Sequence, residues 1–426
     1  MDKIGKYEII RELGRGATST VYLALDTFYN QQVALKLFDL EALHDSSRAK
    51  AYRKQLLTEA SLAGKLSHPH IVSVFDAVMD GELNYVVMEY VEGETLEHYA
   101  SVEHLLPMGT VTEIAYKCCK ALEYAQHQGV IHRDIKPANI LFFGQSDIKI
   151  SDFGAAMILN QQVTQVSGVG SPAYMSPEQV DEKQLTHQTD IYSLGVTMFQ
   201  LLTGKLPFEA SNNYGLIYQI MNVEAQPAST FRPAIPPELD AIILRAMQKD
   251  LSLRYQTWDE FAHDLVSFLS NKKVVAQTEM FDTEKFDTVR SLGFFKDFSD
   301  VELWEVLHVS QWCNIPGGER ILSEGEEGRT FFILASGEVH VLKHGRLLGT
   351  LQKGDCFGEM AHLSEHGFRR TTDVDAKTDV TLIEIDADVL EKATPGCRSR
   401  FDGAFLRLLV KRLDVANTRI SHLLNG

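Results

Sequence analysis

The sequence predicts an α+β protein with a small strand-rich lobe, a larger helical lobe, and an all-β barrel or jelly roll with flanking helices. Three observations predict this arrangement. Apolar and polar residues alternate in short segments near the start, helical spacing takes over in the middle, and alternation returns after residue 320 with evenly spaced glycines. At 426 residues the chain is long enough for two or three domains.

The strand-rich lobe is expected to begin with three antiparallel strands. Glycines punctuate the first turn, and the alternating segments are residues 7–10, 21–25 and 32–38. Residues 45–66 then change to helical spacing, and residues 71–90 have the pattern of a second hairpin. Helical spacing over residues 110–129 and 190–202 predicts the core helices of the larger lobe.

A change in the pattern of apolar and polar residues along the chain predicts the domain boundaries. We place the first domain at residues 1–270 and the second at residues 286–426, because the polar residues 271–285 between them lack strong periodicity. Within the second domain, residues 322–357 alternate between glycine turns, which indicates a β-roll. Residues 399–424 return to helical spacing.

Composition disfavours several classes of function. Asp and Glu outnumber Lys and Arg by 58 to 41, a net charge of −17, so nonspecific nucleic-acid binding is disfavoured. The five cysteines include no C-x-x-C pair, which argues against a zinc ribbon or a disulfide framework. No apolar stretch follows Met1, and the charge-free residues 153–177 are too polar to span a bilayer. We therefore expect a cytoplasmic protein without a membrane span.

The first strand–turn–strand contains Gly14 and Gly16. Glycines in such a turn let backbone N–H groups approach a triphosphate, although glycine pairs are also common in ordinary turns. Lys36 follows on a predicted strand, and Glu59 lies on the predicted helix, where it can pair with Lys36 and hold its ammonium group against phosphates. Each residue alone is more often a solvated side chain, so the signal lies in their combination.

Residues 131–141 carry the most specific pattern of the chain. An aspartate is followed by a lysine two positions later and an asparagine five positions later, just before an apolar run. Asp134 can accept the proton of an attacking hydroxyl, Lys136 can stabilise the transferring phosphoryl group, and Asn139 can hold Mg²⁺. Asp152 of an Asp-Phe-Gly segment supplies a second metal ligand, and this oxygen-only set suits Mg²⁺.

Taken together, these motifs make residues 7–268 resemble the catalytic domain of eukaryotic-type serine/threonine protein kinases, which is bilobal. The resemblance implies ATP as the phosphoryl donor, Mg²⁺ as the cofactor, and Asp134, Lys136 and Lys36 as catalytic residues. The order of the domains resembles bacterial signalling proteins. The resemblance also implies an ATP site made of Leu13, Gly14, Gly16, Val21, Ala34, Lys36, Glu59, Glu89 and Val91.

Further positions resemble the structural residues of the same family. Glu178 belongs to Ser-Pro-Glu at the end of the activation segment, Asp190 matches a buried helix aspartate, and Arg254 is expected to pair with Glu178. Thr164 and Ser167 lie in the charge-free segment and are candidate autophosphorylation sites, because the arginine beside the catalytic aspartate can pair with a phosphate there. Two unmodified loop hydroxyls are the alternative.

A second constellation begins with the turn at Gly358 and Glu359, with Arg369 and Arg370 about ten residues later. Such a turn can cradle a small phosphorylated ring. Glu359 would bind a ribose hydroxyl, an arginine would pair with the phosphate, and backbone N–H groups near Ala361 would complete the nest. The alternative is that the segment binds no ligand, and its pattern then indicates only β-hairpins with glycine turns.

This segment resembles the phosphate-binding cassette of cyclic-nucleotide-binding domains. The resemblance implies cAMP or cGMP as an allosteric ligand, with neither base favoured, and a site made of Gly358, Glu359, Ala361, Arg370 and Thr371. We favour Arg370 over Arg369 for the phosphate because the sequence from Arg370 to Val374 best matches the family's ending, and Arg369 remains the alternative.

The terminal helix has two interpretations. In the resembled family a C-terminal helix closes over the base, which here would use Phe405, Leu406 and Leu409. An amphipathic terminal helix is also typical of plain packing or of a homodimer seam.

The sequence thus predicts a kinase that phosphorylates Ser and Thr hydroxyls of protein substrates under the control of a cyclic nucleotide. Two alternatives stay open: a constitutive kinase whose β-roll only docks substrates, and a cyclic-nucleotide sensor scaffold with weak catalysis.

Overall fold

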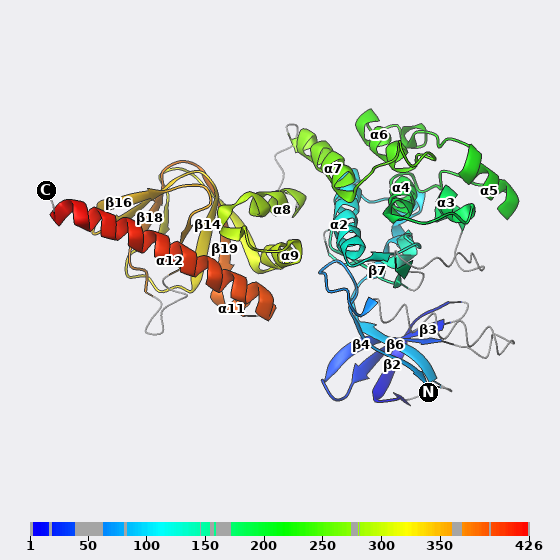
Figure 1. Ribbon diagram of the computed structural model, residues 1–426, viewed down its shortest axis with the longest axis horizontal. Helices are drawn as coiled ribbons and strands as arrows, with labels where there is room; N and C mark the ends of the chain where they lie inside the picture. Colours follow the sequence, from blue (N-terminus) through cyan, green and yellow to red (C-terminus); the bar gives the residue numbers. More distant parts are fainter. Residues whose placement is uncertain are drawn as a thin grey trace. The chain divides into compact units, whose positions relative to one another are not determined.

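The computed structural model describes residues 3–16, 19–38, 63–80, 83–144, 146–153, 157–158, 172–273, 280, 282–359, 369–391 and 393–424. The chain divides into two compact units, Met1–Thr278 and Glu279–Gly426 (Figure 1). Each unit has its own hydrophobic core, and each is described separately.

The first unit begins with a six-stranded sheet in the order β1-β2-β3-β4-β6-β5. Neighbouring strands pair antiparallel throughout. Its strands are β1 (Lys3–Ile4), β2 (Tyr7–Arg15), β3 (Ser19–Asp26), β4 (Gln31–Phe38), β5 (Val74–Asp80) and β6 (Leu83–Glu89). The three expected strands and the hairpin within residues 71–90 are confirmed. Most of the helix expected at residues 45–66 cannot be compared, because residues 45–62 lie outside the described residues.

The larger part of the first unit is mostly helical, and the spacing over residues 110–129 and 190–202 predicts two of its helices. Their bounds are α2 (Met108–His127), α3 (Pro177–Val180), α4 (His187–Thr203), α5 (Asn213–Asn222), α6 (Pro237–Ala246) and α7 (Trp258–Lys273). Helix α2 is buried on nearly all sides and packs against α4 and α7. Gly195 of α4 allows a close approach to α6, since a Cβ there would lie 2.8 Å from the Cβ of Ala246.

Short strands flank the loop that contains the expected catalytic residues Asp134 and Lys136. Strands β7 (Glu94–Thr95), β9 (Ile140–Phe142) and β10 (Ile148–Ile150) form one small sheet. Strand β8 (Val130–Ile131) pairs with β11 (Met157–Ile158). Residues 132–139 therefore leave from β8 and enter β9, both of which are anchored in the core.

The second unit is a β-roll of two four-stranded sheets, ordered β12-β19-β14-β17 and β13-β18-β15-β16. The strands are β12 (Ser310–Ile315), β13 (Arg320–Leu322), β14 (Thr330–Ser336), β15 (Val339–Lys343), β16 (Arg346–Leu351), β17 (Cys356–Phe357), β18 (Asp373–Ala376) and β19 (Val380–Asp386). Apolar side chains from both sheets fill the interior, among them Leu334 and Leu382 from the first sheet and Val339 and Val374 from the second. The expected jelly roll is confirmed.

Helices precede and follow the β-roll along the chain. They are α8 (Asp282–Ser291), α9 (Asp300–Val309), α11 (Ala387–Leu390) and the long α12 (Pro395–Leu424). Helix α12 begins four residues before the expected segment. Its first half is held by Phe401 and Phe405, whose rings pack against Phe294 and Phe331.

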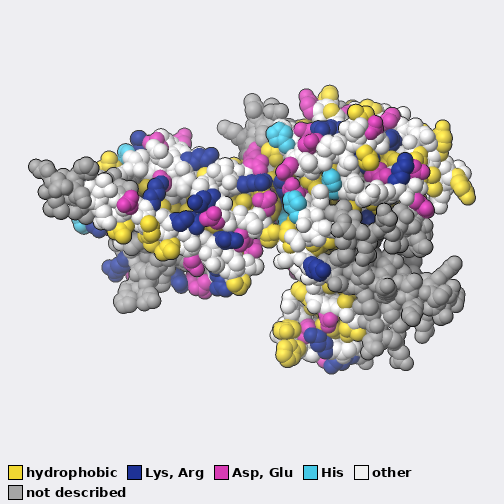
Figure 2. Space-filling view, viewed as in Figure 1, with side chains coloured by type: hydrophobic (Ala, Val, Ile, Leu, Met, Phe, Trp, Pro, Cys, Tyr) yellow, Lys and Arg dark blue, Asp and Glu magenta, His cyan; other side chains and the backbone are white. Residues whose placement is uncertain are grey.

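Residues 271–285, expected to form a linker, are helical at both ends. Helix α7 runs to Lys273 and α8 starts at Asp282, while residues 274–279 and 281 lie outside the described residues. On the face shown in Figure 2, basic and acidic side chains are interspersed over both units. Among the described residues, no helix combines the length and apolar character needed to cross a membrane.

Candidate functional sites

The loop after β8 is fixed by a buried carboxylate from a distant helix. Asp190 of α4 accepts hydrogen bonds from the backbone N–H groups of His132 at 2.8 Å and Arg133 at 2.7 Å. Burial raises the pKa of Asp190, and these backbone donors oppose that rise. Arg133 has a φ of +70°, a left-handed conformation that is costly for a residue with a Cβ. The expectation that Asp190 is buried is therefore confirmed, and its contacts hold this strained turn.

The expected catalytic residue Lys136 and the expected metal ligand Asn139 both contact the carboxylate of Asp134. The Lys136 ammonium donates to Asp134 Oδ2 at 2.7 Å, and the amide nitrogen of Asn139 donates to the same oxygen at 2.9 Å. The Asn139 amide also donates to the Asp134 carbonyl at 2.7 Å. His132 stabilises the turn, because its Nδ1 accepts a hydrogen bond from the Asp134 N–H at 3.2 Å. The Asp134 carboxylate thus accepts hydrogen bonds from two side chains, while the Asp134 side chain stays partly exposed.

Lys36 on β4 pairs with Asp152, with 2.5 Å between the Lys36 ammonium and Asp152 Oδ1. Burial would raise the pKa of Asp152, but the charge and hydrogen bond of Lys36 outweigh it, and the carboxyl pKa lies below its ordinary value. Ser151 donates both its N–H and its hydroxyl to the Asn139 carbonyl, which brings Asn139 beside the Asp152 turn. Glu59, the expected partner of Lys36, lies outside the described residues.

The expected ATP-binding residues come from neighbouring strands of the six-stranded sheet. Val21 lies opposite Lys36 in the β3–β4 ladder, and Ala34 lies opposite the residue before Glu89 in the β4–β6 ladder. Leu13 and Gly14 belong to β2, and the Gly16 N–H closes a turn onto the carbonyl of Ser19. The side chain of Glu89 forms an ion pair with Lys149 at 3.0 Å. Val91 follows directly after this strand.

The predicted structural ion pair of the first unit is confirmed. Arg254 donates to Glu178 at 2.8 Å, with the Arg254 side chain fully buried and that of Glu178 5% exposed. Arg254 also donates to the carbonyls of Gln188 and Gln248. The candidate phosphosites Thr164 and Ser167 lie outside the described residues.

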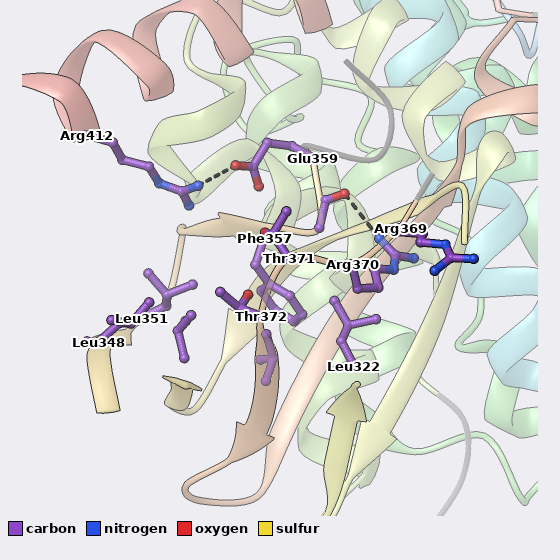
Figure 3. Close-up of a pocket in the computed structure, with 14 residues that line it drawn as sticks. Leu322, Leu348, Leu351, Phe357, Glu359, Arg369, Arg370, Thr371, Thr372 and Arg412 are labelled. Carbon is purple, nitrogen blue, oxygen red and sulfur yellow. Dashed lines mark hydrogen bonds and ion pairs between the residues drawn. The ribbon is translucent and has the colours of Figure 1, made fainter. Parts of the chain in front are cut away.

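A cavity of about 290 Å³ opens in the second unit (Figure 3). Four of the five expected ligand-binding residues line it, namely Gly358, Glu359, Arg370 and Thr371; Ala361 lies outside the described residues. Apolar side chains including Leu348, Leu351 and Phe357 form the rest of the wall. Such a mostly apolar cavity with a few convergent polar groups is typical of a small-molecule site.

Arg370 is 7% exposed, and all its hydrogen bonds to described residues go to neutral acceptors. One terminal nitrogen donates to the carbonyls of Thr330 at 2.7 Å and Gly358 at 3.2 Å, and the other donates to the Thr330 hydroxyl at 2.9 Å. Gly328 lies close beside it: a Cβ there would lie 2.6 Å from the guanidinium, so a larger residue would displace one of the two. Burial lowers the pKa of Arg370, since it penalises the charged form.

Arg369, the other candidate for the phosphate, differs from its neighbour in its surroundings. Its side chain is 75% exposed and faces Glu327 at 3.7 Å, although it also borders the cavity. The structure therefore separates the two arginines by burial: Arg370 is built into the wall and Arg369 lies at the rim.

Sequence reasoning missed Arg412, which reaches the cavity from α12. Its guanidinium donates to Glu359 (Figure 3). It also donates to the carbonyl of Cys356. None of the three expected lid residues lines the cavity. Phe405 packs in the aromatic cluster, and Leu406 is 65% exposed. A charged residue in the middle of a helix carries no motif, so only the contact itself identifies it.

The comparison with known families gives the class of each unit. The protein kinase domain matches residues 7–266, more than half of the chain, so the chain belongs to the protein kinase family. Residues 312–394 match the cyclic nucleotide-binding domain.

The curated relatives that this chain resembles are named as serine/threonine-protein kinases. A probable serine/threonine-protein kinase of Streptomyces coelicolor is 39% identical over 65% of this chain and 42% of its own length. Serine/threonine-protein kinase PrkC of Bacillus subtilis is 35% identical over 61% of this chain and 40% of its own. PknB of Mycobacterium tuberculosis is 34% identical over 67% and 46%. The chain thus spans less than half the length of these relatives.

Proposed function

We propose that the chain is a serine/threonine protein kinase whose activity responds to a cyclic nucleotide bound in its second unit. The observation that carries the kinase assignment is the Asp134 carboxylate, held by Lys136 and Asn139 on a loop anchored by Asp190. The names of the bacterial relatives support the choice of Ser and Thr hydroxyls over other acceptors.

In the proposed reaction Asp134 accepts the proton of the substrate hydroxyl while the hydroxyl oxygen attacks the γ-phosphorus of ATP. The bond to the β-bridging oxygen breaks, and ADP leaves. Lys136 and Lys36 stabilise the charge on the transferring group and on the remaining phosphates. Both lysines already point into this site, since each pairs with one of its carboxylates.

The side chains fit a hard metal ion. The Asn139 amide nitrogen is turned toward Asp134, so the oxygen of the same amide and the Asp152 carboxylate supply oxygen donors. Two protein oxygens with substrate phosphates and water are the usual environment of Mg²⁺, which would neutralise phosphate charge there. Lys36 would then exchange its contact with Asp152 for contacts with the nucleotide.

Arg370 supports the second half of the proposal. Burying a cation among neutral acceptors costs several kcal/mol, a cost that a bound anion offsets. Glu359 lines the same cavity and can accept a hydrogen bond from a ribose hydroxyl. An anion next to a ribose hydroxyl is the chemistry of a cyclic nucleotide, and we assign the phosphate to Arg370. Regulation follows only if the nucleotide favours one state of the kinase over another.

Autophosphorylation with Mg²⁺ and ATP tests both halves at once. The assay is run without nucleotide, with cAMP and with cGMP, and the Asp152→Ala variant is the blank. Activity above the blank that changes with either nucleotide is expected. Activity that is the same with and without either nucleotide would favour a constitutive kinase whose β-roll only docks substrates. No activity in any condition would favour a sensor scaffold. Mass mapping of the active protein tests Thr164 and Ser167 as its phosphosites.

A further inference from the structure

We propose that Lys149 is a positioning residue for the nucleotide of the proposed kinase reaction: its ion pair with Glu89 fixes the backbone at Glu89 and Val91, which receives the nucleoside. This inference rests on the proposed kinase function and adds a residue outside the expected ATP-binding set. It starts from a distance of 3.0 Å between the Lys149 ammonium and Glu89 Oε2. The two side chains are 15% and 27% exposed, so solvent screens the pair only in part.

Lys149 lies on a strand that the core holds in place. It is the middle residue of β10, and its neighbours Ile148 and Ile150 are fully buried. Strand β10 pairs antiparallel with β9. The Ile150 N–H donates to the carbonyl of His70 at 2.8 Å, and the Ile150 carbonyl accepts from the Val72 N–H at 2.9 Å. Lys149 therefore extends its ammonium group from a backbone that is anchored on two sides.

Glu89 is the residue through which this anchor reaches β6. Its Oε2 atom accepts a hydrogen bond from the Ser73 N–H at 3.3 Å in addition to the contact with Lys149. The Glu89 N–H donates to the Ser73 carbonyl at 2.8 Å. Without the Lys149 cation, Glu89 keeps its contacts with Ser73 but loses its link to β10. The end of β6 is therefore less firmly placed in a chain that lacks this ammonium group.

The strand ladder puts Glu89 at the nucleoside end of the proposed site. In the pairing of β4 with β6, Glu89 lies opposite Val33 and Val86 lies opposite Lys36. Three residues of a strand span about 10 Å. Because Lys36 is proposed to bind the phosphates, a nucleotide that extends along the sheet brings its nucleoside to Glu89 and Val91.

This placement decides which step Lys149 affects. A backbone that is fixed before the ligand arrives binds it more tightly, because less conformational freedom is lost on binding. The proposed base Asp134 and the phosphate-binding Lys36 have their own contacts, which do not involve Lys149. Loss of Lys149 should therefore weaken nucleotide affinity and leave the transfer step nearly unchanged.

The test compares Lys149→Met with Lys120→Met in the full chain. Lys120 is a mostly buried lysine of the same unit that binds Glu123 at 3.0 Å and Asp259 at 2.6 Å, so it controls for loss of any such lysine. Initial rates with casein as the acceptor give KM for ATP and kcat separately. Lys149→Met should raise KM for ATP about tenfold, as for about one lost hydrogen bond, with kcat within about twofold.

The control should keep both constants within about twofold of the unaltered chain. An unchanged KM for ATP in Lys149→Met would overturn the proposal, and so would a loss confined to kcat. An equal rise of KM in Lys120→Met would also overturn it, because the effect would then reflect general loosening of the unit.

Two further variants separate positioning from plain stabilisation. Lys149→Arg keeps a cation next to Glu89 and should hold KM for ATP within about threefold of the unaltered chain. If Lys149 acts through Glu89, adding Lys149→Met to Glu89→Gln should change KM by less than about twofold. Effects that multiply in the double variant would overturn the positioning role. A loss in Lys149→Arg as large as in Lys149→Met would overturn it as well.

Direct binding distinguishes failure of this inference from failure of the kinase function. Calorimetry with Mg²⁺ measures the affinity of the full chain for ADP and for tripolyphosphate, which lacks a nucleoside. Lys149→Met should weaken ADP binding about tenfold and tripolyphosphate binding about twofold or less, and equal losses would refute action at the nucleoside end. If the unaltered chain binds ADP but transfers no phosphoryl group, the kinase function fails and the ADP comparison still decides this inference. If it binds neither ligand, both fail.

Discussion

The two candidate sites of this chain balance their charges in opposite ways. In the first unit each lysine is paired with a carboxylate, Lys36 with Asp152 and Lys136 with Asp134, and the four side chains are between 20% and 38% exposed. In the second unit Arg370 is buried against neutral acceptors. In the first site each lysine contacts a carboxylate directly. In the second site the described hydrogen bonds of Arg370 all go to neutral acceptors, so its guanidinium is not in a direct ion pair. This difference predicts where substitutions affect catalysis and where they affect affinity.

The largest expected effect follows from removing the carboxylate at the centre of the first site. Asp134→Asn should lower the rate of phosphoryl transfer roughly a thousandfold, because the amide cannot accept the substrate proton. Steady-state assays on a protein substrate measure this loss. Asp181→Asn is the matched control, since Asp181 lies in the same unit with a side chain 44% exposed, and it should keep full activity. An Asp134→Asn enzyme with near-normal activity would contradict the assigned base.

Breaking the buried pair of the first unit should come next in size. Arg254→Met leaves Glu178 buried without its cation, which should cost about 3 kcal/mol of unfolding free energy. Chemical denaturation of the full chain, followed by signals from the first unit, measures the change. Lys183→Ala removes a pair with Asp181 in which both side chains are exposed, and should leave the unfolding free energy nearly unchanged. Equal costs for the two variants would refute the distinction between buried and exposed pairs.

Arg370→Ala tests the role proposed for the buried arginine of the second site. Loss of the proposed phosphate contacts should weaken cyclic-nucleotide binding roughly a hundredfold, about 2.7 kcal/mol, while kinase activity without nucleotide stays within the range of the unaltered chain. Arg369→Ala, which alters an exposed side chain, should change affinity less than about threefold. Isothermal titration calorimetry gives both values, and a larger loss at Arg369 would reverse the assignment.

A pH effect sharpens the comparison further, because the group responsible, His68, lies in the first unit. Burial lowers the pKa of His68 from 6.5 to about 3, so the folded chain keeps this ring neutral while the unfolded chain protonates it below pH 6.5. The associated stability is full above pH 6.5 and is lost as the pH falls toward 3. Between pH 6.5 and 5 the loss should be about 2 kcal/mol.

Denaturation midpoints at both pH values measure this loss, and His68→Asn should flatten the dependence in the first unit. His98→Asn, at a half-exposed histidine of the same unit, should leave the slope unchanged. An unaltered slope in His68→Asn would show that His68 is not the group responsible.

How far the sequence predicts each site depends on how close its residues lie along the chain. Asp134, Lys136 and Asn139 lie within one loop, where spacing alone brings the side chains together, and the structure places them in contact. The helices and strands around them follow from periodicity. Arg412 lies 53 residues after Glu359, and no spacing rule connects them. None of the lid residues expected on α12 lines the cavity, because an amphipathic pattern does not show what a helix covers.

The sequence by itself determined the two fold classes and the two sets of chemistry, since periodicity and local motifs depend on neighbours along the chain. Only the tertiary structure decided which charges are compensated. It paired Lys36 with Asp152, separated Arg370 from Arg369 by burial, and brought Arg412 to Glu359. The physical reason is that the energy of a charge depends on its solvent exposure and on partners far away in sequence, and both are set when the chain packs.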